Sequence, residues 1–224
     1  MQFIEYPDQD MMMIDLAQTL AGDLENVLFH EDTASLVVPG GTTPGPIFDS
    51  LCAADIEWDR VRVMLSDERW VPESSDRSNT RLVKERLLTG RAAAATWVPL
   101  YADASVPEDK IDALAEGVKD CLPVSVLLLG MGADMHTASL FPGADNLTAA
   151  LDPHAPPLMA MRAPGAPEPR VTLTAPILSG AMSRHIVITG AEKREALERA
   201  RHAKNHEEAP VSVLLNGATV HWAE

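Results

Sequence analysis

The feature that most constrains the fold is an uninterrupted apolar run from Val124 to Leu129, which ends at Gly130. Its length and branched side chains are typical of a strand buried on both faces, as in a parallel sheet covered by helices. In open sheets of that kind, ligands bind at the carboxyl ends of the strands. The residues that follow Gly130 are therefore the first place to look for functional groups.

Similar apolar runs recur along the chain and alternate with helical patterns. Strands are predicted at 2–6, 35–38, 61–65, 97–100, 170–174 and 184–189. Asp8 is a suitable N-cap for a long amphipathic helix with an apolar stripe at Met11, Ile14, Leu16, Leu20, Leu24, Val27 and Leu28. This alternation favours one α/β domain over residues 1–224, a mainly parallel sheet flanked by helices.

Four other segments carry local signals. Ser105 and Glu108 form a Ser-x-x-Glu pattern, which predicts a capping box for a helix that continues to about Cys121. Residues 138–141 are expected to continue a short helix that Pro142-Gly143 ends. Residues 144–169 contain six prolines and are expected to form a long loop, apart from an apolar run at 158–161. Residues 218–222 are expected to form an edge strand.

The charge of the chain narrows the choice of partners. With 18 basic and 33 acidic residues, its formal net charge is −15, which argues against nucleic acid and anionic membrane surfaces. The N-terminus is acidic, and no apolar run approaches the ~20 residues of a membrane span, so we expect a cytoplasmic protein. Cys52 and Cys121 fit buried thiols in a reducing compartment. The seven histidines have no metal-ligand spacing, so no metal site is expected.

The loop after the strand at 35–38 suggests an anion site. It reads Pro39-Gly40-Gly41-Thr42-Thr43-Pro44. Paired glycines, two hydroxyl groups and several backbone N–H groups at the start of a helix make an anion its natural occupant. Read alone, the same residues also fit an ordinary tight turn with a threonine N-cap.

Charged residues follow the strand at 61–65. Asp67, Glu68 and Arg69 come almost directly after it, where burial is expensive unless the charges pair or bind something. The planar guanidinium of Arg69 could hold a phosphate or a developing oxyanion, with Asp67 fixing its geometry. A surface ion-pair network is the alternative interpretation.

An acid and an imidazole follow the central run. Asp134 and His136 lie just past Gly130 and Gly132, which makes His136 the leading candidate for the catalytic group. Farther along, Lys193 is expected in the first turn of a helix, where a cation opposes the helix dipole unless an anion is bound. Together these strand ends fit a sugar phosphate with a reactive end, whose phosphate the basic groups and the loop would hold.

An ordered set of motifs now points to a family. The segments GGTTP, SDERWVP with SN seven residues on, GMGADMHTASLFPG, RVTLT and GAEKREAL span nearly the whole chain. In combination they resemble the 6-phosphogluconolactonase family. The resemblance implies hydrolysis of 6-phosphoglucono-1,5-lactone to 6-phosphogluconate in the oxidative pentose phosphate pathway, without a cofactor. It also implies a fold related to the glucosamine-6-phosphate isomerase type.

The resemblance also assigns roles by position. His136 matches the catalytic histidine of the family, and Asp134 and Arg69 match its active-site neighbours, with Asp67 beside them. Thr42, Thr43, Arg170 and Lys193 match positions that hold the phosphate, with Gly40 and Gly41 in the same loop. A small sugar phosphate is the expected partner, and we expect a monomer or a weak homodimer.

Two departures from the family pattern and two alternatives stay open. Met135 stands where glycine is usual, so the loop either avoids a left-handed conformation there or accepts roughly 1–2 kcal/mol of strain. Pro39 replaces a common serine and removes a hydroxyl and an N–H group. A glucosamine-6-phosphate deaminase/isomerase would share the architecture but needs a base at C2. A non-catalytic sugar-phosphate sensor would keep the loop without requiring His136.

Overall fold

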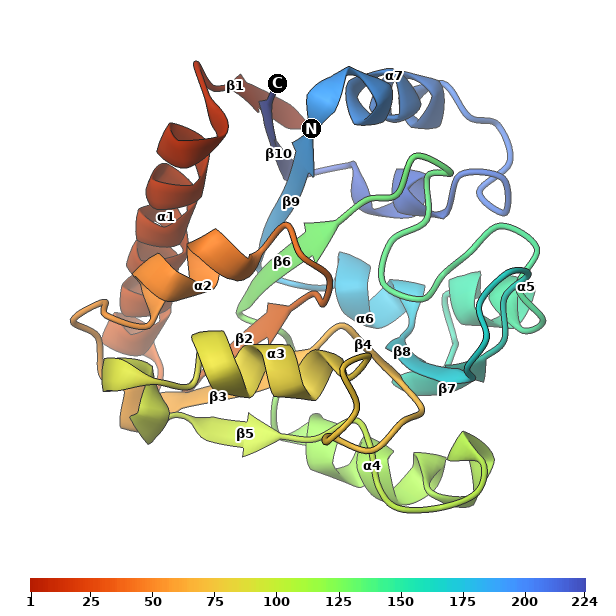
Figure 1. Cartoon of the computed structure of the whole chain (residues 1–224), viewed down its shortest axis with the longest axis horizontal. Helices are drawn as coiled ribbons and strands as arrows, with labels where there is room; N and C mark the ends of the chain where they lie inside the picture. The colour runs from red at the N-terminus through yellow and green to blue at the C-terminus, as the bar shows by residue number, and fades with distance from the viewer.

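The computed structural model describes all residues, 1–224, and is built around a seven-stranded sheet (Figure 1). The strand order is β1-β10-β9-β6-β2-β3-β5, and every neighbouring pair is parallel. The strands are β1 (Gln2–Glu5), β2 (Ala34–Val38), β3 (Val61–Leu65), β5 (Thr96–Val98), β6 (Val126–Gly130), β9 (Ser183–Thr189) and β10 (Thr219–Ala223). The predicted α/β class with a mainly parallel sheet is confirmed.

Helices cover this sheet, as the apolar character of its strands requires. They are α1 (Gln9–His30), α2 (Gly45–Leu51), α3 (Asn79–Arg86), α4 (Ile111–Lys119), α5 (Leu147–Leu151), α6 (Ala175–Ser179) and α7 (Gly190–Arg201). Short 3-10 helices are η1 (Trp58–Arg60), η2 (Gly90–Ala94), η3 (Pro107–Asp109) and η4 (Pro210–Leu214). The longest helix, α1, packs against β10, β2 and β6 and against α2. None of the helices has the length and apolar character to cross a membrane.

The start and the inner face of α1 test the predicted pattern. Asp8 is the N-cap, and its side chain accepts a hydrogen bond from the backbone N of Met11, as predicted. Five positions of the predicted stripe are buried, but Met11 and Ile14 are 55% and 53% exposed. Met12 and Met13 are buried in their place, so the stripe is rotated at its N-terminal end. The methionine cluster therefore mainly fills core space.

Two predictions about chain segments are wrong. The Ser105 capping box does not form. The N-cap of η3 is Val106 and that of α4 is Lys110, and neither helix has a side-chain hydrogen bond at its cap. The C-terminal strand β10 is not an edge strand, since it pairs with β1 on one side and β9 on the other. The edge strand on this side of the sheet is β1, and β5 is the edge strand on the other side.

A second, three-stranded sheet lies beside the main one, to the right of β6 in Figure 1. It consists of β4 (Asp67–Arg69), β8 (Arg170–Leu173) and β7 (Leu158–Met161), all antiparallel. The charged residues at 67–69 thus form a strand, although the sequence suggested only a strand end. Similarly, the expected loop at 144–169 contains α5, and its apolar run at 158–161 is strand β7. The small sheet places Arg69 directly opposite Arg170.

Glu68 anchors this second sheet to α3. Its side chain is fully buried, and its carboxylate accepts five hydrogen bonds, which come from Arg69, Ser78, Asn79 and Thr80. Three of the donors are backbone N–H groups, and two of these belong to the start of α3, where such groups have no partner within the helix. Burial raises the pKa of Glu68, while these hydrogen bonds act to lower it. The carboxylate therefore serves as an internal helix cap.

Replacing this carboxylate should destabilise the fold. Glu68→Ala leaves several buried donors without partners, at about 1–3 kcal/mol each, so we expect the free energy of unfolding to fall by about 3 kcal/mol or more. Urea denaturation measures the change. Glu116→Ala, which removes an exposed carboxylate paired with Lys119 on α4, is the control and should change it by less than about 0.5 kcal/mol. Similar losses for both variants would contradict the capping role.

Candidate active site

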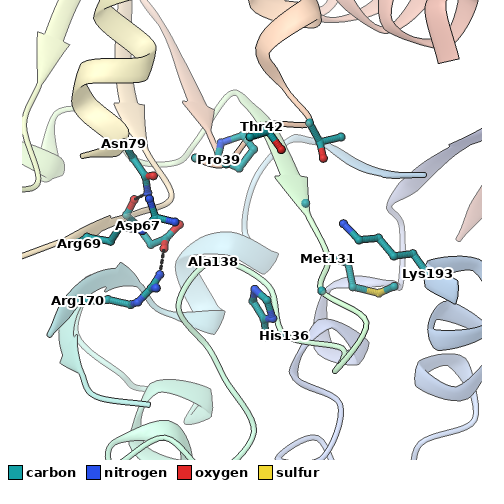
Figure 2. Close-up of a pocket in the computed structure, with 15 residues that line it drawn as sticks. Pro39, Thr42, Asp67, Arg69, Asn79, Met131, His136, Ala138, Arg170 and Lys193 are labelled. Carbon is teal, nitrogen blue, oxygen red and sulfur yellow. Dashed lines mark hydrogen bonds and ion pairs between the residues drawn. The ribbon is translucent and has the colours of Figure 1, made fainter. Parts of the chain in front are cut away.

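Four strand ends converge on one polar pocket with a cavity volume of about 270 Å³ (Figure 2). Its walls come from the ends of β2 and β6, from the small sheet, and from the starts of α3 and α7. The lining residues are Pro39, Gly40, Gly41, Thr42, Thr43, Asp67, Arg69, Asn79, Gly130, Met131, Gly132, His136, Ala138, Arg170 and Lys193. Nine predicted site residues are among them, and Asp134 stands directly behind His136.

The loop after β2 needs its glycines for two different reasons. A Cβ atom on Gly40 would lie 2.0 Å from Oδ1 of Asn79, so the loop and the start of α3 can approach only if residue 40 is glycine. Gly41 has a φ of +85°, in the left-handed region that favours glycine. The turn brings the exposed Thr42 and the half-buried Thr43 to the pocket, while Pro39 is buried in its wall.

His136 is held by its carboxylate neighbour. Nδ1 of His136 lies 2.5 Å from Oδ1 of Asp134, and the same oxygen accepts a hydrogen bond from the backbone N of His136 at 3.2 Å. An imidazole that donates Nδ1–H to a carboxylate keeps a lone pair on Nε2 when it is neutral. Nε2 has no partner in the protein, and the ring lines the pocket. This arrangement suits a general base.

The backbone around His136 is tightly closed. Gly132 N donates to His136 O at 3.0 Å, and Met135 N donates to Gly132 O at 2.9 Å. A Cβ atom on Gly132 would lie 2.2 Å from Nδ1 of His136, so only glycine fits there. Met135 has a φ of +66°, which answers the question raised by its replacement of the usual glycine: the loop accepts the strained conformation.

The predicted short helix at 138–141 is wrong. Leu140 N donates to Thr137 O at 3.0 Å, and these two residues form an isolated antiparallel bridge, so the chain turns tightly. Ala138, with a φ of +48°, is the only other non-glycine residue with positive φ. The turn reverses the chain and stacks the ring of Phe141 on that of His136, with centroids 4.1 Å apart.

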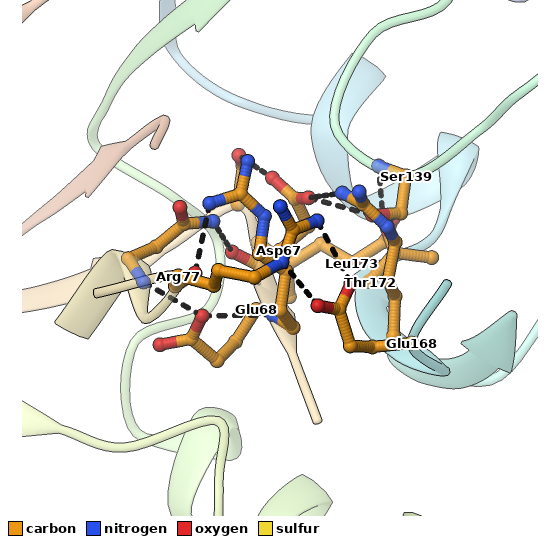
Figure 3. Close-up of polar contacts among 11 residues, drawn as sticks. Asp67, Glu68, Arg77, Ser139, Glu168, Thr172 and Leu173 are labelled. Atoms are coloured by element: carbon orange, nitrogen blue, oxygen red, sulfur yellow. Dashed lines mark hydrogen bonds and ion pairs between the residues drawn. The ribbon is translucent and has the colours of Figure 1, made fainter. Parts of the chain in front are cut away.

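The predicted pairing of Asp67 with Arg69 is also wrong. Asp67 accepts hydrogen bonds from Ser66 Oγ at 3.0 Å and Ser139 Oγ at 2.6 Å, and it forms an ion pair with Arg170 at 3.8 Å (Figure 3). Arg69 instead donates from its Nη1 to the carbonyl of Arg77 at 2.8 Å. Strand β8, which follows Asp67 by about a hundred residues, supplies the partner that the local sequence did not reveal.

Arg69 and Arg170 form one positive side of the pocket. Burial lowers the pKa of Arg170, and the nearby Asp67 acts against that change. The Nε atoms of both arginines are buried without a hydrogen-bond partner. Lys193, from the first turn of α7, lies across the pocket, with His136 between (Figure 2). Three cationic side chains and a single lining carboxylate, Asp67, give the pocket a local excess of positive charge in an acidic protein.

Some pocket residues were missed by sequence reasoning. Asn79 lines the pocket and donates from Nδ2 to the backbone O of Asp67 at 3.1 Å. The sequence did point to Asn79, because Ser78-Asn79 is the SN that follows SDERWVP in the family motif. Met131, which lines the pocket, and Phe141 and Ser139, which lie behind it, gave no signal apart from their place in the histidine segment. No cluster of three or more His, Cys, Asp or Glu side chains could hold a metal ion.

Comparisons with known proteins agree over the whole chain. The family described as "Glucosamine-6-phosphate isomerases/6-phosphogluconolactonase" matches residues 7–222. A 6-phosphogluconolactonase of Rhizobium meliloti is 42% identical over 219 residues, covering 93% of the chain and 94% of the relative. One of Pseudomonas aeruginosa is 38% identical over 210 residues, covering 92% and 88%. The chain belongs to this family.

Membership in the glucosamine-6-phosphate isomerase/6-phosphogluconolactonase family extends to the three-dimensional structure. The crystal structure of a 6-phosphogluconolactonase from Shewanella baltica has a TM-score of 0.96 to the chain at 32% identity, covering 100% of the chain and 97% of that structure. The predicted resemblance and the predicted fold type are therefore confirmed. The individual roles of the pocket residues stay predictions.

The close fit of Gly132 against His136 gives a direct test of the loop. Gly132→Ala should displace the imidazole and its carboxylate partner, and misplacement of a catalytic group by about 1 Å costs about 10²-fold in rate. We therefore expect kcat to fall by about that factor while the protein stays folded by circular dichroism. Gly117→Ala adds the same methyl group on α4, where the nearest atom is 3.9 Å away, and should leave kcat unchanged. Normal turnover in Gly132→Ala would contradict the close fit.

Proposed function

We propose that the protein hydrolyses the ring ester of 6-phosphoglucono-1,5-lactone to 6-phosphogluconate. The observation that carries the proposal is the Asp134–His136 pair, whose free Nε2 belongs to a ring lining a pocket with three cationic side chains. A general base beside an anion site is what hydrolysis of a phosphorylated lactone requires. The curated relatives from R. meliloti and P. aeruginosa carry the same activity in their names.

In the proposed mechanism, neutral His136 takes a proton from water as the water oxygen attacks C1 of the lactone. Asp134 stabilises the imidazolium that forms and keeps Nε2 as the basic nitrogen. The C1–ring oxygen bond of the tetrahedral intermediate then breaks, and the imidazolium returns its proton to the departing ring oxygen. Water is consumed, His136 is regenerated, and no cofactor takes part.

The charge that develops on the carbonyl oxygen needs a donor. Arg69 is our candidate, because it lies on the pocket wall and its Nε has no partner in the protein. The backbone N–H of Met131 is a second candidate donor near His136, since that of Gly132 already donates to His136 O. One good donor aimed at the oxyanion contributes roughly 3–4 kcal/mol to transition-state stabilisation.

The phosphate would lie away from the reacting carbon. Thr42 and Thr43 supply hydroxyl groups, Gly40 and Gly41 open the loop backbone, and Lys193 faces them from α7 (Figure 2). A bound phosphate also removes the unfavourable contact between Lys193 and the helix dipole. Arg170, buried beside Asp67, would complete the set from the other wall.

The structure disfavours the deaminase alternative. That reaction needs a base at C2, and Asp67 is the only carboxylate that lines the pocket. Asp67 is 6% exposed, and Ser66, Ser139 and Arg170 already occupy its oxygens. Its oxygens are therefore committed to contacts within the protein. A non-catalytic sensor would have no need of the strained loop that holds His136 against Asp134.

The first experiment is hydrolysis of freshly generated 6-phosphogluconolactone, corrected for spontaneous opening. Unphosphorylated gluconolactone and glucosamine 6-phosphate are measured in parallel. Fast turnover of the phosphorylated lactone alone is the expected result. Release of ammonia from glucosamine 6-phosphate would establish the deaminase instead, and binding without turnover of any substrate would establish the sensor.

Loss of the imidazole should remove most of the activity. We expect His136→Ala to lower kcat by about 10²-fold or more, because a positioned general base contributes about 10²–10⁴-fold. The free energy of unfolding should change little, since the ring is part of an open pocket. His154→Ala, at an exposed position outside the pocket, is the control. Near-normal turnover in His136→Ala would remove this residue from the mechanism.

Lys193 should govern substrate choice. Lys193→Ala removes a charge that only a phosphorylated substrate can use, so kcat/KM should fall for 6-phosphogluconolactone and stay nearly constant for gluconolactone. The ratio of the two kcat/KM values is the quantity to measure. Lys204→Ala, which removes an equal charge outside the pocket, should leave that ratio unchanged. An equal loss on both substrates in Lys193→Ala would contradict a role in phosphate binding.

A further inference from the structure

Phe141 does not line the pocket, yet it contacts two groups that do. Its ring and the imidazole of His136 are stacked, with centroids 4.1 Å apart and planes inclined by 22°. The guanidinium carbon of Arg170 lies 5.1 Å from the centroid of the same phenyl ring. One aromatic side chain therefore contacts both the proposed base and a cationic side chain of the opposite wall.

The backbone is built to bring Phe141 to this position. Thr137 Oγ1 donates to Gly130 O at 2.9 Å, which fixes the start of the turn to the end of β6. The turn then passes through Ala138 in its left-handed conformation, and Ser139 is bound to Asp67. Such strain persists only where the surroundings impose it, and it is concentrated at functional sites.

Stacking on Phe141 restricts a rotation of the His136 ring that the hydrogen bond to Asp134 still allows. A hydrogen bond at Nδ1 fixes one edge of the imidazole, but the ring can still rock about the line of that bond. A phenyl ring packed parallel to the imidazole plane opposes this rocking, and offset-stacked aromatic pairs are favourable beyond the area they bury. The π face of Phe141 also favours the charged form of Arg170, whose burial works in the other direction.

We propose that Phe141 is a positioning residue, which keeps His136 Nε2 directed into the pocket and holds Arg170 at a fixed place relative to it. The proposal rests on the proposed lactonase function for its kinetic consequence. Its structural consequence, the ordered stack on His136, does not depend on which reaction the site performs.

The test compares two substitutions. Phe141→Leu keeps apolar volume but removes the ring, and should lower kcat for 6-phosphogluconolactone by about tenfold or more, with a smaller change in KM. Phe141→Tyr keeps the ring and should restore most of the turnover. In NMR spectra, the ring protons of His136 should lose their aromatic ring-current shift in Phe141→Leu and keep it in Phe141→Tyr. Phe141→Met replaces the leucine variant if that variant does not fold.

The outcomes separate the two claims. Wild-type turnover in Phe141→Leu, or His136 ring signals that do not move, would overturn the positioning role. If the wild-type protein fails to hydrolyse the lactone, the proposed function is wrong, and the NMR comparison still decides whether Phe141 orders His136. A loss of kcat that Phe141→Tyr does not reverse would reduce Phe141 to a packing residue.

A second observation, outside the pocket, concerns a chain of hydrogen bonds between α1 and the main sheet. Tyr6 OH lies 2.7 Å from Oδ2 of Asp15 and 2.9 Å from Nδ1 of His221. Nε2 of His221 lies 3.0 Å from Nδ1 of His185. Nε2 of His185 lies 2.8 Å from Oδ2 of Asp23. Asp15 and Asp23 belong to α1, and the two histidines to β10 and β9.

This chain of hydrogen bonds needs one more proton than its neutral members supply. Four hydrogen bonds require four donated protons. With both aspartates ionised, Tyr6 and two neutral imidazoles provide only three. Ser183 Oγ contacts both Asp23 Oδ2 and, at 3.0 Å, His185 Nε2, and its single proton can serve only one of these contacts, so it cannot supply the bond between His185 and Asp23. All four bonds form together only when the imidazole pair carries one additional proton.

The surroundings of the pair are consistent with one proton and not two. His185 and His221 are 5% and 1% exposed. Burial, followed by the neighbouring His185, lowers the pKa of His221 to about 4. The hydrogen bonds from His185 and Ser183 lower the pKa of Asp23 in spite of burial, which keeps it ionised. Asp15 and Asp23 are the charged groups that face the pair from α1.

We infer that the His185–His221 pair holds one proton beyond two neutral imidazoles, and that this proton makes the attachment of α1 to the sheet dependent on pH. Unfolded, the pair binds two protons below roughly pH 6.5 and none above it. Because the folded pair binds one, its contribution to stability falls as pH moves in either direction from about 6.5.

The alkaline side gives a clear test by urea denaturation at about pH 6.5 and about pH 9. Asp15→Asn lets an amide N–H donate to Tyr6, so four bonds form with neutral imidazoles. Tyr6→Phe removes two of the bonds and with them the deficit. In the wild type we expect the urea midpoint to fall between the two pH values. In both variants it should stay nearly constant. Asp10→Asn, the same charge change elsewhere on α1, should keep it.

An equal alkaline fall in Asp15→Asn and in Asp10→Asn would overturn the inference. So would a wild-type midpoint that does not change between the two pH values. If Asp15→Asn does not fold, Tyr6→Phe alone decides the question, because it predicts the same loss of pH dependence from a different structural change.

Discussion

The structure depends on one constraint, the burial of a parallel sheet on both faces. Strands of this kind run in the same direction, so their carboxyl ends meet at one edge. The segments after β2, β3, β6 and β9 are separated by up to about 150 residues in sequence, yet they share a single pocket. The apolar runs that force this arrangement contain no functional group themselves. They determine which polar residues become neighbours.

This constraint explains what could be predicted from the sequence. The end of each apolar run marks the end of a strand, and the polar residues just beyond it reach the common edge. The parallel architecture and most of the pocket residues could therefore be predicted from the sequence. The strand pairing within the small sheet could not. A three-residue strand such as β4 is too short to show a period, and its partner β8 is distant in sequence, so Asp67 was assigned to Arg69 instead of Arg170.

The pocket also concentrates positive charge within an acidic protein. Its net charge of −15 would repel a phosphorylated substrate unless basic groups were concentrated locally. Arg69 and Arg170 lie on neighbouring strands of the small sheet, and such a like-charged pair is unfavourable by itself. Asp67 offsets part of this repulsion, and it is bound by Ser66 and Ser139, so it stays in place. A substrate anion would offset the remainder.

The loop that carries His136 is held in a conformation that its own residues disfavour. Met135 and Ala138 are the only non-glycine residues with positive φ, and each left-handed position costs roughly 1–2 kcal/mol. Contacts outside the loop sustain it, since Val211 N donates to Met135 O at 3.1 Å and Thr137 is bound to the end of β6. Packing of the main sheet and of η4 thus offsets the local strain. A binding site for phosphate alone would need neither turn, whereas an imidazole held against Asp134 and stacked on Phe141 requires both.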